Sequence, residues 1–398
     1  MRPVQRVPFA AMDKSDLLPR RSWRTRLLAA GAIISLVAAC GQASVATSAG
    51  APAGATTQAA ASLPGAGGGG SSQPGQASPG GPASASAGGS PAAAGTTAGA
   101  FPGGFLIADR GNGRLLAIDR TGKIWWRFPT SAAGAVPAGQ AFAADDAFLS
   151  PDGLTIVAND ETHEVIDRID IATGKITWQY GHYNRAGSGA GFLHTPDDAY
   201  PLANGDIVVA DIENCRVIEI SPAKKIVHQW GRAGACRAAA PTSYARPNGD
   251  TPLPDGGILI TEIGGSRVVR LDAAGHVVFD IHVPVHYPSD AQLNSDGNVV
   301  VADYNNPGAV VIVSPTGKLL WRYAPTSGAG RLDYPSLATP LPDGTIVIND
   351  DFRHRLVIVN PATNKIVWQY GVTDQAGSGA NHLNVPDGHE PLPAGLSF

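Results

Sequence analysis

The chain has 398 residues, with 29 basic and 33 acidic side chains and a formal net charge of −4. Seven basic but only two acidic residues precede position 40, so the remainder carries 22 basic and 31 acidic side chains and a net charge of −9. A moderately acidic chain binds polyanions poorly, which argues against nucleic acid as a partner.

Residues 1–39 have the features of a secretory signal peptide. Arginines between positions 20 and 26 precede an apolar run, and small residues end that run directly before Cys40. The run is shorter than the roughly 20 residues that span a bilayer. The pattern resembles a bacterial lipoprotein signal, in which the cysteine becomes the lipidated N-terminus; the alternative is an ordinary signal cleaved near Ala39. The Arg20-Arg21 pair leaves twin-arginine export open. We expect a protein anchored by lipid to the outer surface of a membrane in the bacterial cell envelope.

Residues 40–100 form a tether in this interpretation. From position 41 onward the segment contains no charged residue and little beyond Ala, Gly, Ser, Thr, Pro and Gln. Such a composition cannot build a core, so we predict a disordered linker. Its expected end-to-end distance is roughly 40 to 50 Å, enough to hold a folded domain clear of a lipid surface.

One motif recurs from residue 101 to residue 398. The copies align on the glycine of a short turn: Gly153, Gly205, Gly256, Gly297 and Gly344. Six residues later stands an almost purely acidic column: Asn159, Asp211, Glu262, Asp303 and Asp350. An arginine follows in most copies, and we interpret these pairs as structural because a site used once does not need several copies. Self-similarity at a fixed period marks a repeat architecture.

Each copy reads as four short strands, named A to D from the start of the copy. In the copy at residues 196–231, the runs 206–211, 216–220 and 226–230 are rich in β-branched residues and bounded by turns. Four such strands are the unit of a propeller blade. The first copy, residues 104–128, lacks strand A, whereas residues 385–395 contain a spare one. The sequence therefore predicts an all-β, six-bladed β-propeller that is closed by pairing of the N-terminal and C-terminal strands.

Long connections between strand D and the next strand A fall on one face of this propeller. They are residues 181–196, 231–247 and 371–386, and binding groups usually lie on such loops over a rigid scaffold. Cys215, at a B to C turn, and Cys236, in a D to A loop, belong to the same face. In an oxidising compartment they could form a disulfide; the alternative is two buried thiols.

Strand A lines the central channel, so its polar residues are candidates for a site. The candidate ligand-binding residues are four carboxylates and an arginine: Asp146, Asp198, Asp250, Asp290 and Arg246. Three histidines lie on or near these strands: His194, His286 and His389. This set could hold Ca²⁺ or another divalent cation, or position a small polar ligand. The alternative is that each aspartate caps a turn and that the channel holds water.

Two resemblances are carried by the repeats. The segment IDIATGKITWQY is similar to pyrroloquinoline-quinone-type repeats, and ADRGNGRLLAID and ADIENCRVIEI resemble the Asp-x-x-Asn-x-Arg pattern of NHL-type six-bladed propellers. Quinoprotein dehydrogenases have eight blades and adjacent cysteines, neither of which this sequence predicts, so we do not expect the quinone cofactor. The chain also has a distant similarity to arylsulfotransferase-type propellers. Together with NHL-type lyases, that similarity implies His389, His194 and His286 as candidate catalytic residues.

We expect a monomeric, surface-tethered extracytoplasmic propeller. It would bind a small molecule, a cell-wall component or a protein on its loop-rich face and channel mouth. The alternative is an enzyme of arylsulfotransferase or lyase type, and the sequence leaves this choice open. The separation of the three histidines distinguishes the two: convergence in one pocket favours the enzyme, and dispersal favours the binding module.

Overall fold

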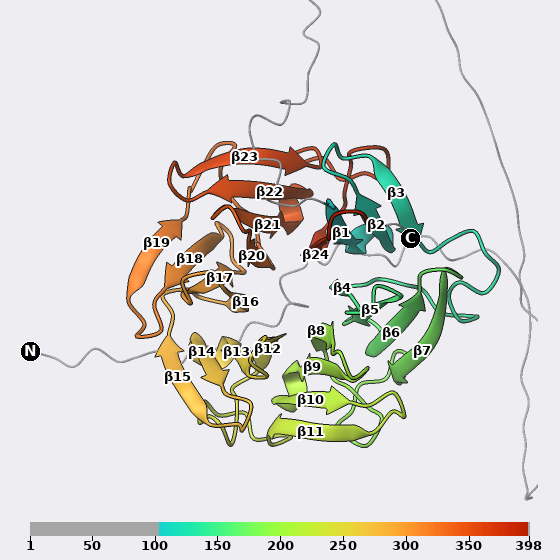
Figure 1. Cartoon of the computed structure of the whole chain (residues 1–398), viewed down its shortest axis with the longest axis horizontal. Helices are drawn as coiled ribbons and strands as arrows, with labels where there is room; N and C mark the ends of the chain where they lie inside the picture. The colour runs from blue at the N-terminus through green and yellow to red at the C-terminus, as the bar shows by residue number, and fades with distance from the viewer. Residues whose placement is uncertain (1–102, 397–398) are drawn as a thin grey trace, which may run out of the picture. The chain divides into compact units, whose positions relative to one another are not determined.

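A computed structural model describes residues 103–396. Within these residues, six four-stranded antiparallel sheets surround a central axis (Figure 1). The prediction of an all-β six-bladed propeller is confirmed. The signal peptide, Cys40 and the tether lie outside the described residues.

Each sheet is one blade, and its strands are given from the axis outward. Blade 1 contains β24 (Pro386–Pro391), β1 (Phe105–Asp109), β2 (Arg114–Ile118) and β3 (Ile124–Phe128). Blade 2 contains β4 (Ala147–Leu149), β5 (Thr155–Asp160), β6 (Val165–Asp170) and β7 (Lys175–Gly181). Blade 3 contains β8 (Pro196–Pro201), β9 (Ile207–Asp211), β10 (Arg216–Ile220) and β11 (Ile226–Gly231).

The second half of the ring repeats this plan. Blade 4 contains β12 (Pro247–Pro252), β13 (Ile258–Glu262), β14 (Arg267–Leu271) and β15 (Val277–His282). Blade 5 contains β16 (Pro288–Leu293), β17 (Val299–Asp303), β18 (Ala309–Val313) and β19 (Leu319–Tyr323). Blade 6 contains β20 (Ala338–Pro340), β21 (Ile346–Asp350), β22 (Arg355–Asn360) and β23 (Lys365–Tyr370).

Helical structure in the described part is limited to four three-residue 3-10 turns. They are η1 (Arg110–Asn112), η2 (Ile212–Asn214), η3 (Ile263–Gly265) and η4 (Asp351–Arg353), and each follows the second strand of its blade. None of the helices in residues 103–396 has the length and apolarity needed to cross a membrane.

The hydrophobic core consists of layers between neighbouring blades. Val157 and Ile166 of blade 2 pack in one cluster with Val209 and Ile218 of blade 3, for example. Because each blade is covered on both faces, its inner strands are continuous apolar runs rather than alternating ones. All five residues of β9 are buried, whereas most of the outer strand β11 is partly or fully exposed.

The last described strand closes the ring, as predicted. β24 pairs antiparallel with β1, with Phe105 opposite Pro391 and Ile107 opposite His389. In Figure 1 the dark red β24 lies at the axis beside the teal β1. Residues far apart in the sequence therefore form one sheet, and closure of this kind leaves no unpaired inner strand at the junction.

The acidic column joins each B to C turn to the loop that enters from the preceding blade. In blades 1, 3 and 6 one carboxylate oxygen accepts a hydrogen bond from the arginine five residues later, at 2.6 to 2.7 Å: Asp109 from Arg114, Asp211 from Arg216, Asp350 from Arg355. The other oxygen accepts a backbone N–H at the end of the incoming loop, at 2.7 Å in each case: Asn384, His194 and Asp333. The column is therefore structural in these blades.

Blade 2 departs from the predicted alignment. Its acidic residue is Asp160, not Asn159, because Asp160 pairs with Val165 as Asp109 pairs with Arg114 in blade 1. Asp160 Oδ2 accepts the backbone N–H of Ala143 at 3.0 Å, which is the same role. The turn in this blade has one extra residue before the strand, so counting six residues from Gly153 stops one position short.

Candidate functional site: an axial carboxylate cluster

The inner strands place a series of aspartates around the axis. Five of the six inner segments begin with a proline, and the two positions that follow it, with their equivalents in blade 2, carry most of these residues. Asp250 lies one position further along β12. The axial cluster comprises seven aspartates, each at most 4% exposed: Asp145, Asp146, Asp197, Asp198, Asp250, Asp290 and Asp387. Four of these seven are predicted from the sequence, whereas Asp145, Asp197 and Asp387 are not.

Irregularities in the inner strands aim these side chains. The pairing of β8 with β9 shifts register between Asp197 and Tyr200, and the pairings of β12 with β13 and of β16 with β17 shift at equivalent places. Asp198 has φ +49°, a conformation that aspartate tolerates better than most residues. A regular strand turns consecutive side chains to opposite faces, and a bulge relaxes that rule. The consecutive residues Asp197 and Asp198 can therefore both direct their side chains toward the axis.

Two glycines make room for carboxylates of the neighbouring blade. A Cβ at Gly388 would lie 2.3 Å from Asp146 Oδ1, and a Cβ at Gly249 would lie 2.7 Å from Asp290 Oδ1. Both distances are far below van der Waals contact. At these two positions a side chain would displace an aspartate of the cluster.

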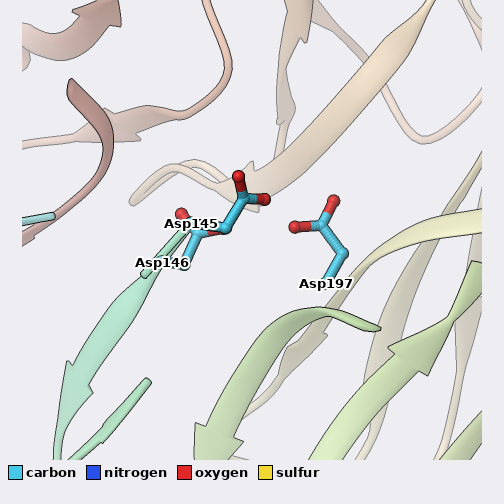
Figure 2. Close-up of side chains that lie close together, drawn as sticks. All are labelled: Asp145, Asp146 and Asp197. Atoms are coloured by element: carbon cyan, nitrogen blue, oxygen red, sulfur yellow. The ribbon is translucent and has the colours of Figure 1, made fainter. Parts of the chain in front are cut away.

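Three of the carboxylates converge closely. Asp145 and Asp146 precede β4, and Asp197 lies on β8, so the group bridges blades 2 and 3 (Figure 2). Each residue offers one oxygen, and these oxygens all lie within 4.8 Å of one another. Burial of like charges at this spacing is costly unless a proton or a cation neutralises them.

One side of the cluster is neutralised by Arg110 of η1. Its guanidinium donates to Asp145, to Asp387 Oδ2 at 2.6 Å and to Glu161 Oε2 at 3.2 Å. Arg110 was not among the predicted residues, although the sequence contains a signal for it. The residue after the acidic column is basic in blade 1 and apolar, aromatic or acidic in the other blades. On the other side, Asn248 Nδ2 donates to Asp197 Oδ2 at 2.6 Å and to the Ser289 carbonyl at 2.8 Å.

Burial dominates the electrostatics of the remaining aspartates. It raises the pKa of Asp198 and of Asp250 well above the usual value, and the charges of Asp146 and Asp290 raise both further. Burial also raises the pKa of Asp290, and hydrogen bonds from Gln292 and other donors oppose that rise. Within residues 103–396, neither carboxylate oxygen of Asp250 has a hydrogen-bond partner.

The three candidate histidines occupy different environments. His389 lies on β24, is 1% exposed, and shares a hydrogen bond between Nδ1 and Asn349 Oδ1; burial lowers its pKa to about 3. The side chain of His286 is 70% exposed and contacts Asp303. His194 is half-buried, and its backbone N–H donates to Asp211. No hydrogen bond or ring contact in the described structure joins any two of these histidines.

Two further candidates lie on the loop-rich face. Arg246, directly before β12, donates to Glu213 of η2. Cys215 and Cys236 form a disulfide with a Cα–Cα distance of 5.1 Å. This bond ties the loop after β11 to the turn that precedes β10, so the loop is fixed to its own blade.

Comparison with known proteins identifies the family. Residues 69–226 and 227–387 match the family model described as outer membrane protein assembly factor BamB. No curated protein matches the chain. A crystal structure of a protein of unknown function from Bacteroides caccae is similar with a TM-score of 0.50 and 15% identity, over 72% of this chain and 97% of that chain.

Two other solved structures have lower scores. A catalytically inactive virginiamycin B lyase from Staphylococcus aureus with quinupristin has a TM-score of 0.41 and 19% identity, over 56% of this chain and 68% of that chain. A nidogen/laminin complex has a TM-score of 0.48 and 12% identity, over 72% and 96%. At these identities a structural likeness concerns the fold alone. The repeats in the sequence and the propeller fold are consistent with the family match, which covers both halves of the chain. The chain belongs to the family of the outer membrane protein assembly factor BamB, a class of propellers with PQQ-like repeats.

Proposed function

We propose that this protein is a binding scaffold of the cell envelope that presents its loop-rich face and channel mouth to a protein partner. The loop-rich face contains the five longer of the six connections between blades, residues 129–146, 182–195, 232–246, 324–337 and 371–385. The family description, an assembly factor, supports a scaffold role outside the cytoplasm. A lipid anchor at Cys40 belongs to the same proposal, because a tethered propeller could meet partners at a membrane surface.

The observation that carries the proposal is the fixed conformation of these long loops. Asn214 Nδ2 of blade 3 donates to the Gly187 carbonyl in the loop from blade 2, at 2.9 Å. Asn112 Nδ2 of blade 1 makes the equivalent bond to the Gly377 carbonyl, at 2.8 Å. Arg353 donates to the Gly328 carbonyl in a third loop, at 3.0 Å. Loops that are ordered before binding lose less conformational entropy when a partner docks.

Two of the loops present the same local structure at separate places on the face. Gly187 N–H donates to the Leu193 carbonyl at 2.9 Å, and Gly377 N–H donates to the Leu383 carbonyl at 3.0 Å. The repeated shape favours recognition of an extended surface over a single catalytic centre.

The placement of the histidines supports binding over the enzymatic alternative. General acid–base catalysis by a histidine set requires groups within hydrogen-bond reach of one substrate. His286 is largely exposed, whereas His389 is enclosed in the wall of the axis. A sulfotransferase-like or lyase-like mechanism that uses all three would need them in one pocket.

Site-specific photo-crosslinking tests the scaffold proposal. A photoreactive amino acid replaces Ser188 or Ser378, two exposed positions in the repeated loops. Matched controls replace Asp296 or Asp343, exposed positions in the short turns on the opposite face. In cells of the source organism we expect a discrete protein adduct from the loop positions and none from the controls. Adducts of equal yield from both faces, or none from either loop, would overturn the proposal.

Membrane fractionation tests the anchor. The Cys40→Ser variant removes the only atom that could carry the lipid at the predicted cleavage site, so we expect it to leave the membrane fraction. Mass spectrometry of the parent should show a lipid adduct on the peptide that begins at Cys40. Membrane association that is unchanged in the variant, with no lipid adduct in the parent, would contradict this prediction.

A further inference from the structure

The axial cluster brings seven buried carboxyl groups together around one guanidinium group, that of Arg110. Asp145 and Asp387 share the guanidinium of Arg110, and Asp197 accepts a hydrogen bond from the neutral amide of Asn248. Asp146, Asp198 and Asp250 are 4% exposed or less. Carboxylates gathered in a protein interior repel one another, and protons or a bound cation relieve that repulsion.

A second observation points to a ligand rather than to protons alone. Asp250 is fully buried on β12, and both of its oxygens lack a hydrogen-bond partner among residues 103–396; so does Oδ2 of Asp198 on β8. A protonated carboxyl would still need acceptors and donors, because buried polar atoms are almost always hydrogen-bonded. The charges of Asp197, Asp290 and Asp146 act on Asp250, so its carboxyl group lies near the other members of the cluster.

We propose that the axis binds one divalent cation of the Ca²⁺ class, held by Asp145, Asp146 and Asp197. The donor set consists of oxygens alone, which favours Ca²⁺, Mg²⁺ or Mn²⁺ over metals that prefer nitrogen or sulfur. Calcium binds oxygens at about 2.3 to 2.6 Å, so two ligands on opposite sides of the ion stand about 4.6 to 5.2 Å apart. The three oxygens within 4.8 Å of one another fit one ion at that spacing.

The surroundings have the features of a constructed site. Gly388 leaves the space that the carboxylate of Asp146 occupies, and Arg110 and Asn248 position Asp145 and Asp197 from either side. Asp198 Oδ2 and both oxygens of Asp250 have no hydrogen-bond partner among residues 103–396, so they could accept hydrogen bonds from water molecules of the ion. The ion would join blades 2 and 3 at the axis. This inference does not depend on the identity of the partner on the loop-rich face.

Calcium titration of the purified full chain tests the proposal. After treatment with EDTA and dialysis, isothermal titration calorimetry with CaCl₂ at pH 7.5 should show one ion per chain, and Ca²⁺ should raise the Tm by several degrees. MgCl₂ should bind more weakly, because Mg²⁺ demands shorter bonds and a stricter geometry.

Two variants and a matched control complete the test. Asp146→Asn and Asp197→Asn should each weaken calcium binding at least tenfold, and in EDTA each should be no less stable than the parent because charge repulsion is relieved. Asp296→Asn changes an exposed aspartate in a turn and should bind calcium as the parent does. A parent with no calcium binding and no Tm shift, or full calcium binding in both axial variants, would overturn the proposal.

Discussion

Asp167 illustrates the energetic cost of a single buried carboxyl outside the axis. It lies on β6, is 3% exposed, and accepts a hydrogen bond from Gln179 Nε2 at 2.8 Å. Burial raises its pKa to about 7, and the charge of Asp160 adds to the rise. The folded protein thus binds this proton more tightly than the unfolded chain does. The contribution of Asp167 to stability is greatest below about pH 4 and is lost as the pH rises to about 7.

Replacement of Asp167 by asparagine should remove this loss. At pH 8 we expect Asp167→Asn to be more stable than the parent by about 1 to 3 kcal/mol, and at pH 5 the gain should be smaller. Urea unfolding at both pH values measures the difference, with Asp296→Asn as the exposed control. A variant that is less stable than the parent at pH 8 would show that the carboxylate is stabilised by contacts beyond Gln179.

Single residues of the site were predictable only where they follow the repeat. Asp146, Asp198 and Asp290 occupy one column, and Asp250 lies one position later, so alignment on the turn glycines identified them. Asp145 and Asp197 precede that column by one residue, where a regular strand would turn the side chain away from the axis. Arg110 is basic in one blade only. An alignment of the repeats shows what the copies have in common and does not reveal residues that occur in only some of the blades. Several residues of the axial cluster are of this kind.

At the scale of the element, the Asp-x-x-Asn-x-Arg turn explains why repetition predicted structure better than function. Its aspartate accepts a hydrogen bond from the backbone of the loop that enters from the preceding blade, and its arginine donates to the aspartate. Its asparagine donates to a carbonyl of the same loop. The sequence predicted a structural role from the repetition alone. It did not predict the direction of the neighbouring histidines: the backbone N–H groups of His194 and His286 both donate to the acidic column, and the side chain of His286 is left largely exposed.

At the scale of the whole molecule, the ring could be predicted because it depends on counting. The strands of each copy can be recognised from the local sequence pattern. The first copy lacks strand A, and the C-terminal residues contain a spare strand A that completes it. The shape of the axis depends instead on six strands from distant parts of the chain, with bulges that no local pattern specifies. The architecture was therefore predictable from the repeats, apart from the shift of one residue in blade 2, and the candidate site was predictable only in part.

The closing strand joins more than one sheet. β24 pairs with β1 along its length, Asp387 binds Arg110, and His389 bonds Asn349 of blade 6. Glu390 Oε2 accepts the backbone N–H of Leu149 in blade 2 at 2.5 Å. One strand of six residues thus connects blades 1, 2 and 6, so its loss would open the ring at the axis.

Deletion of residues 386–398 should therefore destabilise the whole propeller. The truncated chain leaves β1 paired with β2 alone and Arg110 without one of its carboxylates. We expect the free energy of unfolding to fall by about 5 kcal/mol or more. Removal of residues 41–100, which the sequence predicts to be a tether, is the matched deletion and should leave the Tm unchanged. Calorimetry of both proteins measures the effect. Side chains of the inner strands form hydrogen bonds between blades at the axis, so the short deletion should also broaden the unfolding transition. An unchanged Tm in the truncated protein would mean that the ring does not depend on its closing strand.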